Sequence, residues 1–110
     1  MSGLNNGAIT KEEIEEFAKY VLGHLIYIAL GLRKDMVFTY LENWKMKWTT
    51  ASPSICMKDR KIIFIEERYI GKYPWVAKEN ILHEIAHVFT DGHGTEFYRV
   101  YIKLLSDFML

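Results

Sequence analysis

The first apolar pattern along the chain has the spacing of an α-helix. Thr10 and Glu13 are spaced as a capping box, in which each side chain accepts a hydrogen bond from the other residue's backbone N–H. Apolar residues then recur three and four positions apart: Ile14, Phe17, Ala18, Val21, Leu22, Leu25, Ile28 and Ala29. This pattern predicts one long core helix that ends at Gly31.

Residues 35–67 have the pattern of short β-strands instead. β-branched and aromatic residues gather in four runs separated by turn-like residues. The runs cover residues 36–40, 45–49, 54–57 and 61–65. We expect a small sheet of three or four strands, in which Lys58, Asp59 and Arg60 form a solvated hairpin turn between the last two runs.

Two further helices complete the predicted fold. Pro74 suits the first turn of a helix whose apolar stripe faces the core and whose polar face borders a cleft. The stripe contains Leu82, Ile85, Ala86 and Phe89, and the polar face contains Asn80, His83, Glu84 and His87. Residues 91–94 break this helix, and Thr95 can cap a last helix that runs to the C-terminus. The order helix, sheet, helix, helix predicts an α+β fold.

Length and composition indicate a single soluble domain over residues 1–110, with residues 1–9 as a loose lead-in rather than a signal peptide. The longest apolar stretch, residues 20–32, is shorter than the roughly 20 residues of a membrane-spanning helix. The chain has 14 basic and 14 acidic residues, which does not favour nucleic acid as a partner. The single cysteine, Cys56, excludes an internal disulfide and fits a reducing compartment, so we expect a cytoplasmic location with no membrane partner.

The segment from His83 to His87 has the spacing of a catalytic zinc site. The two histidines lie one helical turn apart on the same face, and Glu84 lies about 100° round the helix from His83. A catalytic zinc ion needs a third protein ligand and one open position. His93 is the best third ligand, because a glycine on each side lets the chain turn back sharply. Glu96 and Asp107 are weaker candidates.

These residues predict hydrolysis of peptide bonds. Zinc would polarise the substrate carbonyl, while Glu84 would accept a proton from the water that attacks and return it to the leaving amine. Tyr98 and Tyr69 are near enough in sequence to stabilise the oxyanion, although core packing is the more common role of a tyrosine. The alternative is a non-catalytic structural or assembly module, in which Cys56 or Glu96 supplies a fourth ligand to zinc.

At these residues the chain resembles the zincin metallopeptidases, and within them the small soluble minigluzincins. The resemblance extends over nearly the whole chain. It implies His83, His87 and His93 as zinc ligands and Glu84 as the general base, with His93 in place of the glutamate of most gluzincins. The His-Gly-x-x-Phe-aromatic signature from His93 to Tyr98 is also similar to that of SprT-like and YgjP-like peptidases. Metzincins require glycine three residues after the second histidine, where this chain has Thr90.

The C-terminal helix carries apolar residues on more than one side. One stripe contains Phe97, Val100, Tyr101, Leu104, Leu105 and Phe108, and a second contains Tyr98, Ile102 and Met109. Because minigluzincins are latent zymogens held by C-terminal segments, the resemblance implies that residues 103–110 cover the cleft of their own chain or of a partner in a homodimer. The other interpretation is an ordinary, tightly wrapped core helix.

Overall fold

The first helix, α1, is shorter than the sequence pattern predicts. The computed structural model describes residues 7–30, 35–41 and 43–109. In it, α1 spans Lys11–Leu22 and is followed by Gly23. The capping box is confirmed: the Glu13 N–H donates to Thr10 Oγ1 (3.2 Å), and the Thr10 N–H donates to Glu13 Oε1 (3.0 Å). The buried face of α1 consists of Ile14, Ala18, Val21 and Leu22.

The prediction that this helix continues to Gly31 is wrong. Residues Leu25–Leu30 form strand β1, which pairs antiparallel with β2 (Asp35–Tyr40) in a separate two-stranded sheet. A run that is apolar at every position fits the period of a helix and that of a strand equally well. Its Ile and Tyr residues favour a strand, and pairing with β2 satisfies the backbone groups along one edge of each segment. The predicted strand at 36–40 therefore exists, but outside the main sheet.

The main sheet has three strands in the order β3-β5-β4. Strand β3 (Lys45–Thr49) runs parallel to the central strand β5 (Ile62–Glu66), and β4 (Ile55–Met57) runs antiparallel to it. The predicted hairpin turn at residues 58–60 is confirmed between β4 and β5. A short 3-10 helix, η2 (Glu67–Tyr69), leads from β5 towards α2.

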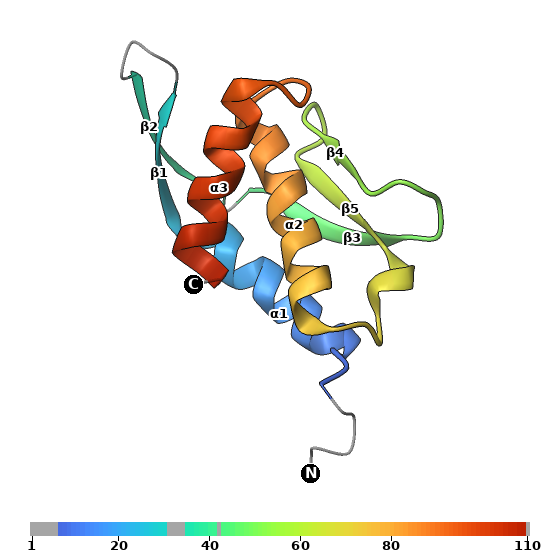
Figure 1. Cartoon of the computed structure of the whole chain (residues 1–110). Coiled ribbons are helices and arrows are strands. Elements are labelled where there is room, and N and C mark those ends of the chain that lie inside the picture. The colour runs from blue at the N-terminus through green and yellow to red at the C-terminus, as the bar shows by residue number, and fades with distance from the viewer. Residues whose placement is uncertain (1–6, 31–34, 42, 110) are drawn as a thin grey trace.

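Helix α2 (Pro74–Phe89) is the central element of the fold, and Pro74 occupies its first turn as predicted. Figure 1 shows α2 between α3 (Thr95–Met109) on one side and strands β4 and β5 on the other. Its fully buried residues are Ala77, Ile81, Leu82, Ile85 and Ala86. The fold is α+β, with three helices and a small mixed sheet that packs against α1 and α2, as the sequence predicts in outline. In the described part of the chain, no helix has the length and apolar character needed to cross a membrane.

Candidate metal centre

Three histidines come together where α2 ends and the chain turns back into α3. His83 and His87 lie on α2, and His93 lies in the connecting loop. Helix α2 ends at Phe89, and the hydroxyl of the next residue, Thr90, donates to the Ala86 carbonyl (3.2 Å). Gly92 then adopts a φ of 70°, a left-handed conformation that residues with a side chain rarely adopt. This turn returns His93 to the face of α2.

The side-chain nitrogens of these histidines are spaced as ligands of one ion. His93 Nε2 lies 3.2 Å from His83 Nε2 and 3.1 Å from His87 Nε2. Tetrahedral zinc with Zn–N distances of about 2.0–2.1 Å would separate two ligand nitrogens by roughly 3.3 Å. The two separations from His93 therefore match those of zinc ligands, and all three ligand atoms lie within 4.8 Å of one another. A neutral Nε2–H of His93 could donate to only one neighbour at a time, so mutual hydrogen bonding explains the grouping less well.

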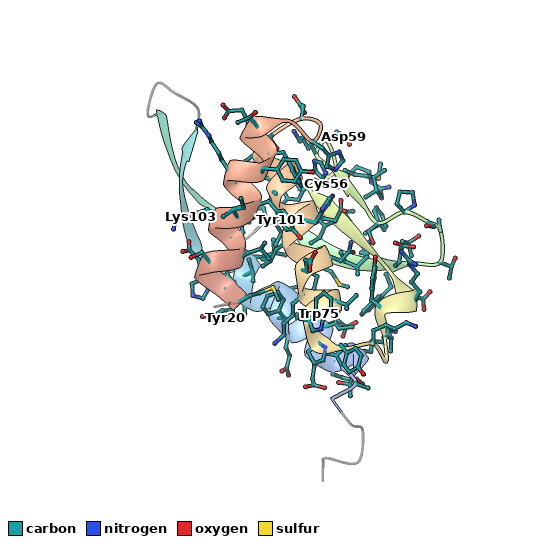
Figure 2. The ribbon with its side chains drawn as sticks, in the orientation of Figure 1. Tyr20, Cys56, Asp59, Trp75, Tyr101 and Lys103 are labelled. Atoms are coloured by element: carbon teal, nitrogen blue, oxygen red, sulfur yellow. The ribbon has the colours of Figure 1, made fainter. Side chains whose placement is uncertain are left out.

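The weaker ligand candidates lie outside this group. Among the described residues, His83, His87 and His93 form the cluster whose possible ligand atoms all lie within 4.8 Å of one another. Glu96 is exposed on the first turn of α3, and Asp107 instead accepts a hydrogen bond from Lys103 Nζ (2.6 Å). Cys56 is half-buried on β4, a strand that contacts α2 (Figure 2). It does not belong to the histidine cluster either.

The ring of Phe97 packs against all three imidazoles. Its ring centroid lies 4.9 Å from that of His83, 4.6 Å from His87 and 4.8 Å from His93, and its side chain is 1% exposed. The sequence pattern placed Phe97 in an apolar stripe and in the His-Gly-x-x-Phe-aromatic signature, but indicated no role for it at the metal site. Its position four residues after His93 is the signal that could have indicated this role, because it places the ring one turn into α3, directly after the ligand loop.

Burial keeps the two helix histidines in the form that binds metal. Burial, followed by the neighbouring His83, His93 and Lys58, lowers the pKa of His87 to about 4. Burial and His93 also lower the pKa of His83, against the opposing charge of Glu79. A neutral imidazole has a free lone pair for a metal ion, so protons compete weakly for these two nitrogens at neutral pH.

Glu84 is a buried carboxylate beside the histidines. Its residue is 4% exposed, and burial followed by the charge of Glu66 raises its pKa from 4.5 to about 7. Glu66 is equally buried, but it accepts hydrogen bonds from Ser54 and pairs with Arg68 Nε (3.0 Å). Although burial opposes the shift, these partners hold the pKa of Glu66 below its usual value. Glu84 is thus the one of these two carboxyl groups suited to exchanging a proton near neutral pH.

An open cleft of about 550 Å³ gives access to this centre. Its lining includes Glu84 and the three histidines on one side and residues of β4 and the end of β5 on the other. Lys58 links the two sides of the cleft, because its Nζ donates hydrogen bonds to the Thr90 carbonyl (3.1 Å) and to Asp91 Oδ1 (2.8 Å). The hairpin turn that the sequence pattern treats as merely solvated therefore anchors the loop that carries His93.

The tyrosines are placed differently from one another. Tyr69 lines the cleft, whereas Tyr98 is 51% exposed and packs against Phe97 without lining the cleft. Tyr101 was not singled out by the sequence, yet its ring packs edge-on against His83 with centroids 5.5 Å apart. It lies on α3, where that helix meets α2 (Figure 2).

The C-terminal segment lies away from the cleft. Phe108 packs against Tyr20 and His24 near the end of α1, with ring centroids 6.1 and 5.6 Å apart. None of residues 103–109 is among those that line the cleft. Figure 1 shows the C-terminus at the end of α3 opposite to the loop that leaves α2. Coverage of the chain's own cleft is therefore not found among the described residues, and latency through a neighbouring chain stays a prediction.

No family model, curated protein or solved structure matches this chain. The geometry of the cleft and its residues therefore carries the functional argument.

Proposed function

We propose that the protein is a zinc-dependent endopeptidase of the zincin type. The observation that carries this proposal is the convergence of three histidine nitrogens, at 3.1 and 3.2 Å, beside a buried glutamate in an open cleft. The arrangement also agrees with the resemblance to minigluzincins. We further propose a soluble, cytoplasmic protein, because a lone half-buried cysteine suits a reducing compartment.

His83, His87 and His93 would hold the metal ion. Zinc bound there would supply a Lewis acid that polarises a carbonyl and lowers the pKa of water to about 7. Three protein ligands leave one of four tetrahedral positions for water and substrate. The described cluster contains three such groups, so it fits a catalytic site better than a closed structural site with four ligands.

Glu84 would move the proton. Its carboxyl lines the same cleft as the histidines, and its pKa of about 7 lies close to neutral pH. A group with such a pKa can accept a proton from the attacking water and then return it to the leaving amine. Positioned acid–base groups of this kind typically contribute 10²–10⁴-fold to the rate, by order of magnitude.

The alternative is a structural or assembly module that binds zinc without catalysis. It would require a fourth protein ligand, for which Cys56 and Glu96 are the sequence candidates. Neither belongs to the described cluster of possible ligand atoms. A structural site would also have no use for a buried carboxylate beside the metal, because burying an uncompensated acid destabilises the fold.

The test combines metal content with peptide cleavage. Protein purified without chelators should hold about one zinc ion per chain and cleave a mixture of quenched fluorescent peptides. Glu84→Ala should keep the zinc and lose cleavage by about 10²-fold or more. Glu96→Ala, which changes an exposed glutamate outside the metal cluster, should keep both. Zinc-loaded protein that cleaves no peptide either as the whole chain or after truncation at Ser106, or full cleavage by Glu84→Ala, would overturn the proposal.

A further inference from the structure

A second, smaller cavity adjoins the cleft at His83. Its volume is about 170 Å³, and it shares Tyr69, Asn80 and His83 with the cleft. The rest of its lining comes from the first turns of α2 and from α3: Trp75, Val76, Glu79 and Tyr101. Glu79 is the only acidic or basic residue among these lining residues apart from the histidine and the tyrosines. The mechanism proposed above does not use it.

The second ring nitrogen of His83, Nδ1, is not the atom that approaches His93. Its Nε2 is the atom that approaches His93 Nε2, at 3.2 Å. If Nε2 binds a metal ion, the remaining proton of the neutral ring must be on Nδ1, which then needs an acceptor. Histidines that bind metals almost always donate this second N–H to a carboxylate, a backbone carbonyl or water.

Glu79 is well placed to be this acceptor. It precedes His83 by four residues on α2, so the two side chains lie on the same face, one turn apart. Side chains on a helix lean towards its N-terminus, which tilts the His83 ring over the turn that carries Glu79. In agreement with this proximity, the Glu79 charge acts to raise the pKa of His83.

Tyr101, on the opposite helix, lines the same cavity as Glu79 and packs against His83. The Tyr101 ring lies edge-on to His83, with an interplanar angle of 74° and centroids 5.5 Å apart. Burial, a hydrogen-bonding interaction with Glu79 and the charge of Glu79 together raise the pKa of Tyr101. Tyr101 and Glu79 both line the smaller cavity, so the phenol lies near the carboxylate, while the ring of Tyr101 packs against the imidazole of His83.

We propose that Glu79 is a positioning residue of the metal centre, which accepts the Nδ1–H of His83 and is itself held by the hydroxyl of Tyr101. The proposal rests on metal binding by His83, His87 and His93, as proposed above. In this arrangement Glu79 fixes the tautomer of His83 and the direction of Nε2, and its charge makes the imidazole a stronger ligand. Partners of this kind typically change metal affinity by about 10–100-fold.

The experiment is a zinc competition titration against a chromophoric chelator. Glu79→Gln, which removes the charge but keeps the shape, should bind zinc about 10–100-fold more weakly than the wild type. Tyr101→Phe should weaken binding less, and the double variant should bind no more weakly than Glu79→Gln alone, because Tyr101 acts through Glu79. Glu96→Gln, an exposed glutamate on α3, is the matched control and should bind like the wild type.

Cobalt substitution gives a second readout that does not depend on activity. The visible absorption bands of bound Co²⁺ should shift in Glu79→Gln and not in Glu96→Gln, because only Glu79→Gln changes the hydrogen bonding of a metal ligand, His83. If Glu79→Gln fails to fold, Glu79→Asp serves instead, with a shorter carboxylate that should weaken zinc binding as well. Wild-type affinity and spectra in a folded Glu79 variant would overturn the positioning role. Absence of zinc binding by the wild type would instead overturn the proposed function.

Discussion

Glu84→Gln should stabilise the metal-free protein above pH 7, although it removes the proposed general base. Glu84 is 4% exposed, and burial followed by the charge of Glu66 raises its pKa from 4.5 to about 7. Between these two pH values the folded protein keeps a proton that the unfolded chain has released. The free energy of unfolding therefore falls as the pH rises through this window, and the loss is complete above pH 7.

The magnitude follows from the pKa shift. A shift of about 2.5 units corresponds to about 3.4 kcal/mol, at about 1.36 kcal/mol per unit. Because the carboxyl borders an open cleft, solvent screening reduces this value, and we expect about 2 kcal/mol. Glutamine has nearly the same shape but does not titrate. The variant should match the wild type in stability below pH 4.5 and exceed it by about 2 kcal/mol at pH 8.

Urea unfolding in the presence of a chelator, followed by tryptophan fluorescence at several pH values from 4.5 to 8, measures this difference. The histidines titrate in the opposite direction, but they are present in both proteins and largely cancel. Glu66→Gln is the matched control, because Glu66 is equally buried but accepts hydrogen bonds from Ser54 and pairs with Arg68. It should lose stability at pH 8. A difference between Glu84→Gln and wild type that stays constant from pH 4.5 to 8 would refute the reasoning.

Three further outcomes are expected. In a chelator competition, His93→Ala should weaken zinc binding by a larger factor than the loss of a residue that only hydrogen-bonds to a ligand, which typically costs about 10–100-fold. Glu96→Ala should leave zinc binding unchanged. Burial and then the charge of Glu84 raise the pKa of Cys56 from 9.0 to about 11. Its thiol should therefore react roughly 10-fold more slowly with a disulfide reagent at pH 8 than an unperturbed cysteine does. The smaller thiolate fraction alone would slow the reaction more, but a thiolate of higher pKa is a stronger nucleophile. A chain that ends at Ser106 should melt at a lower temperature but cleave peptides at the same rate per folded molecule, because residues 107–109, the described part of the missing segment, do not line the cleft. A higher rate would indicate that the tail restrains a cleft.

The elements that could be predicted are those with strong local signals. The capping box of Thr10 fixes the start of α1, and Pro74 fixes the start of α2. The end of α1 could not be predicted, because residues 25–30 are apolar at every position and satisfy both periods. Antiparallel pairing with β2, the next strand along the chain, decides their conformation, and periodicity within the run does not show this pairing.

In the candidate site, too, local sequence signals predict some contacts and not others. His83 and His87 are brought together by one turn of helix, and His93 by a short turn with a left-handed glycine, so their spacing predicts the cluster. The bond from Lys58 to Asp91 joins segments 33 residues apart, and the contact between Tyr101 and His83 depends on how two helices pack. Such contacts follow from the tertiary arrangement, which local spacing does not encode.

The position of Phe97 couples the metal centre to the hydrophobic core. Its ring contacts all three histidines, and the same side chain is 1% exposed among the core residues of α2 and α3.

A ligand that binds only the folded state stabilises it by about 4 kcal/mol when present at about 1,000 times its Kd. That gain exceeds the about 2 kcal/mol expected from burying the charge of Glu84. Metal binding can therefore maintain a buried acid in the cleft, which the metal-free core holds only at a loss of stability above neutral pH.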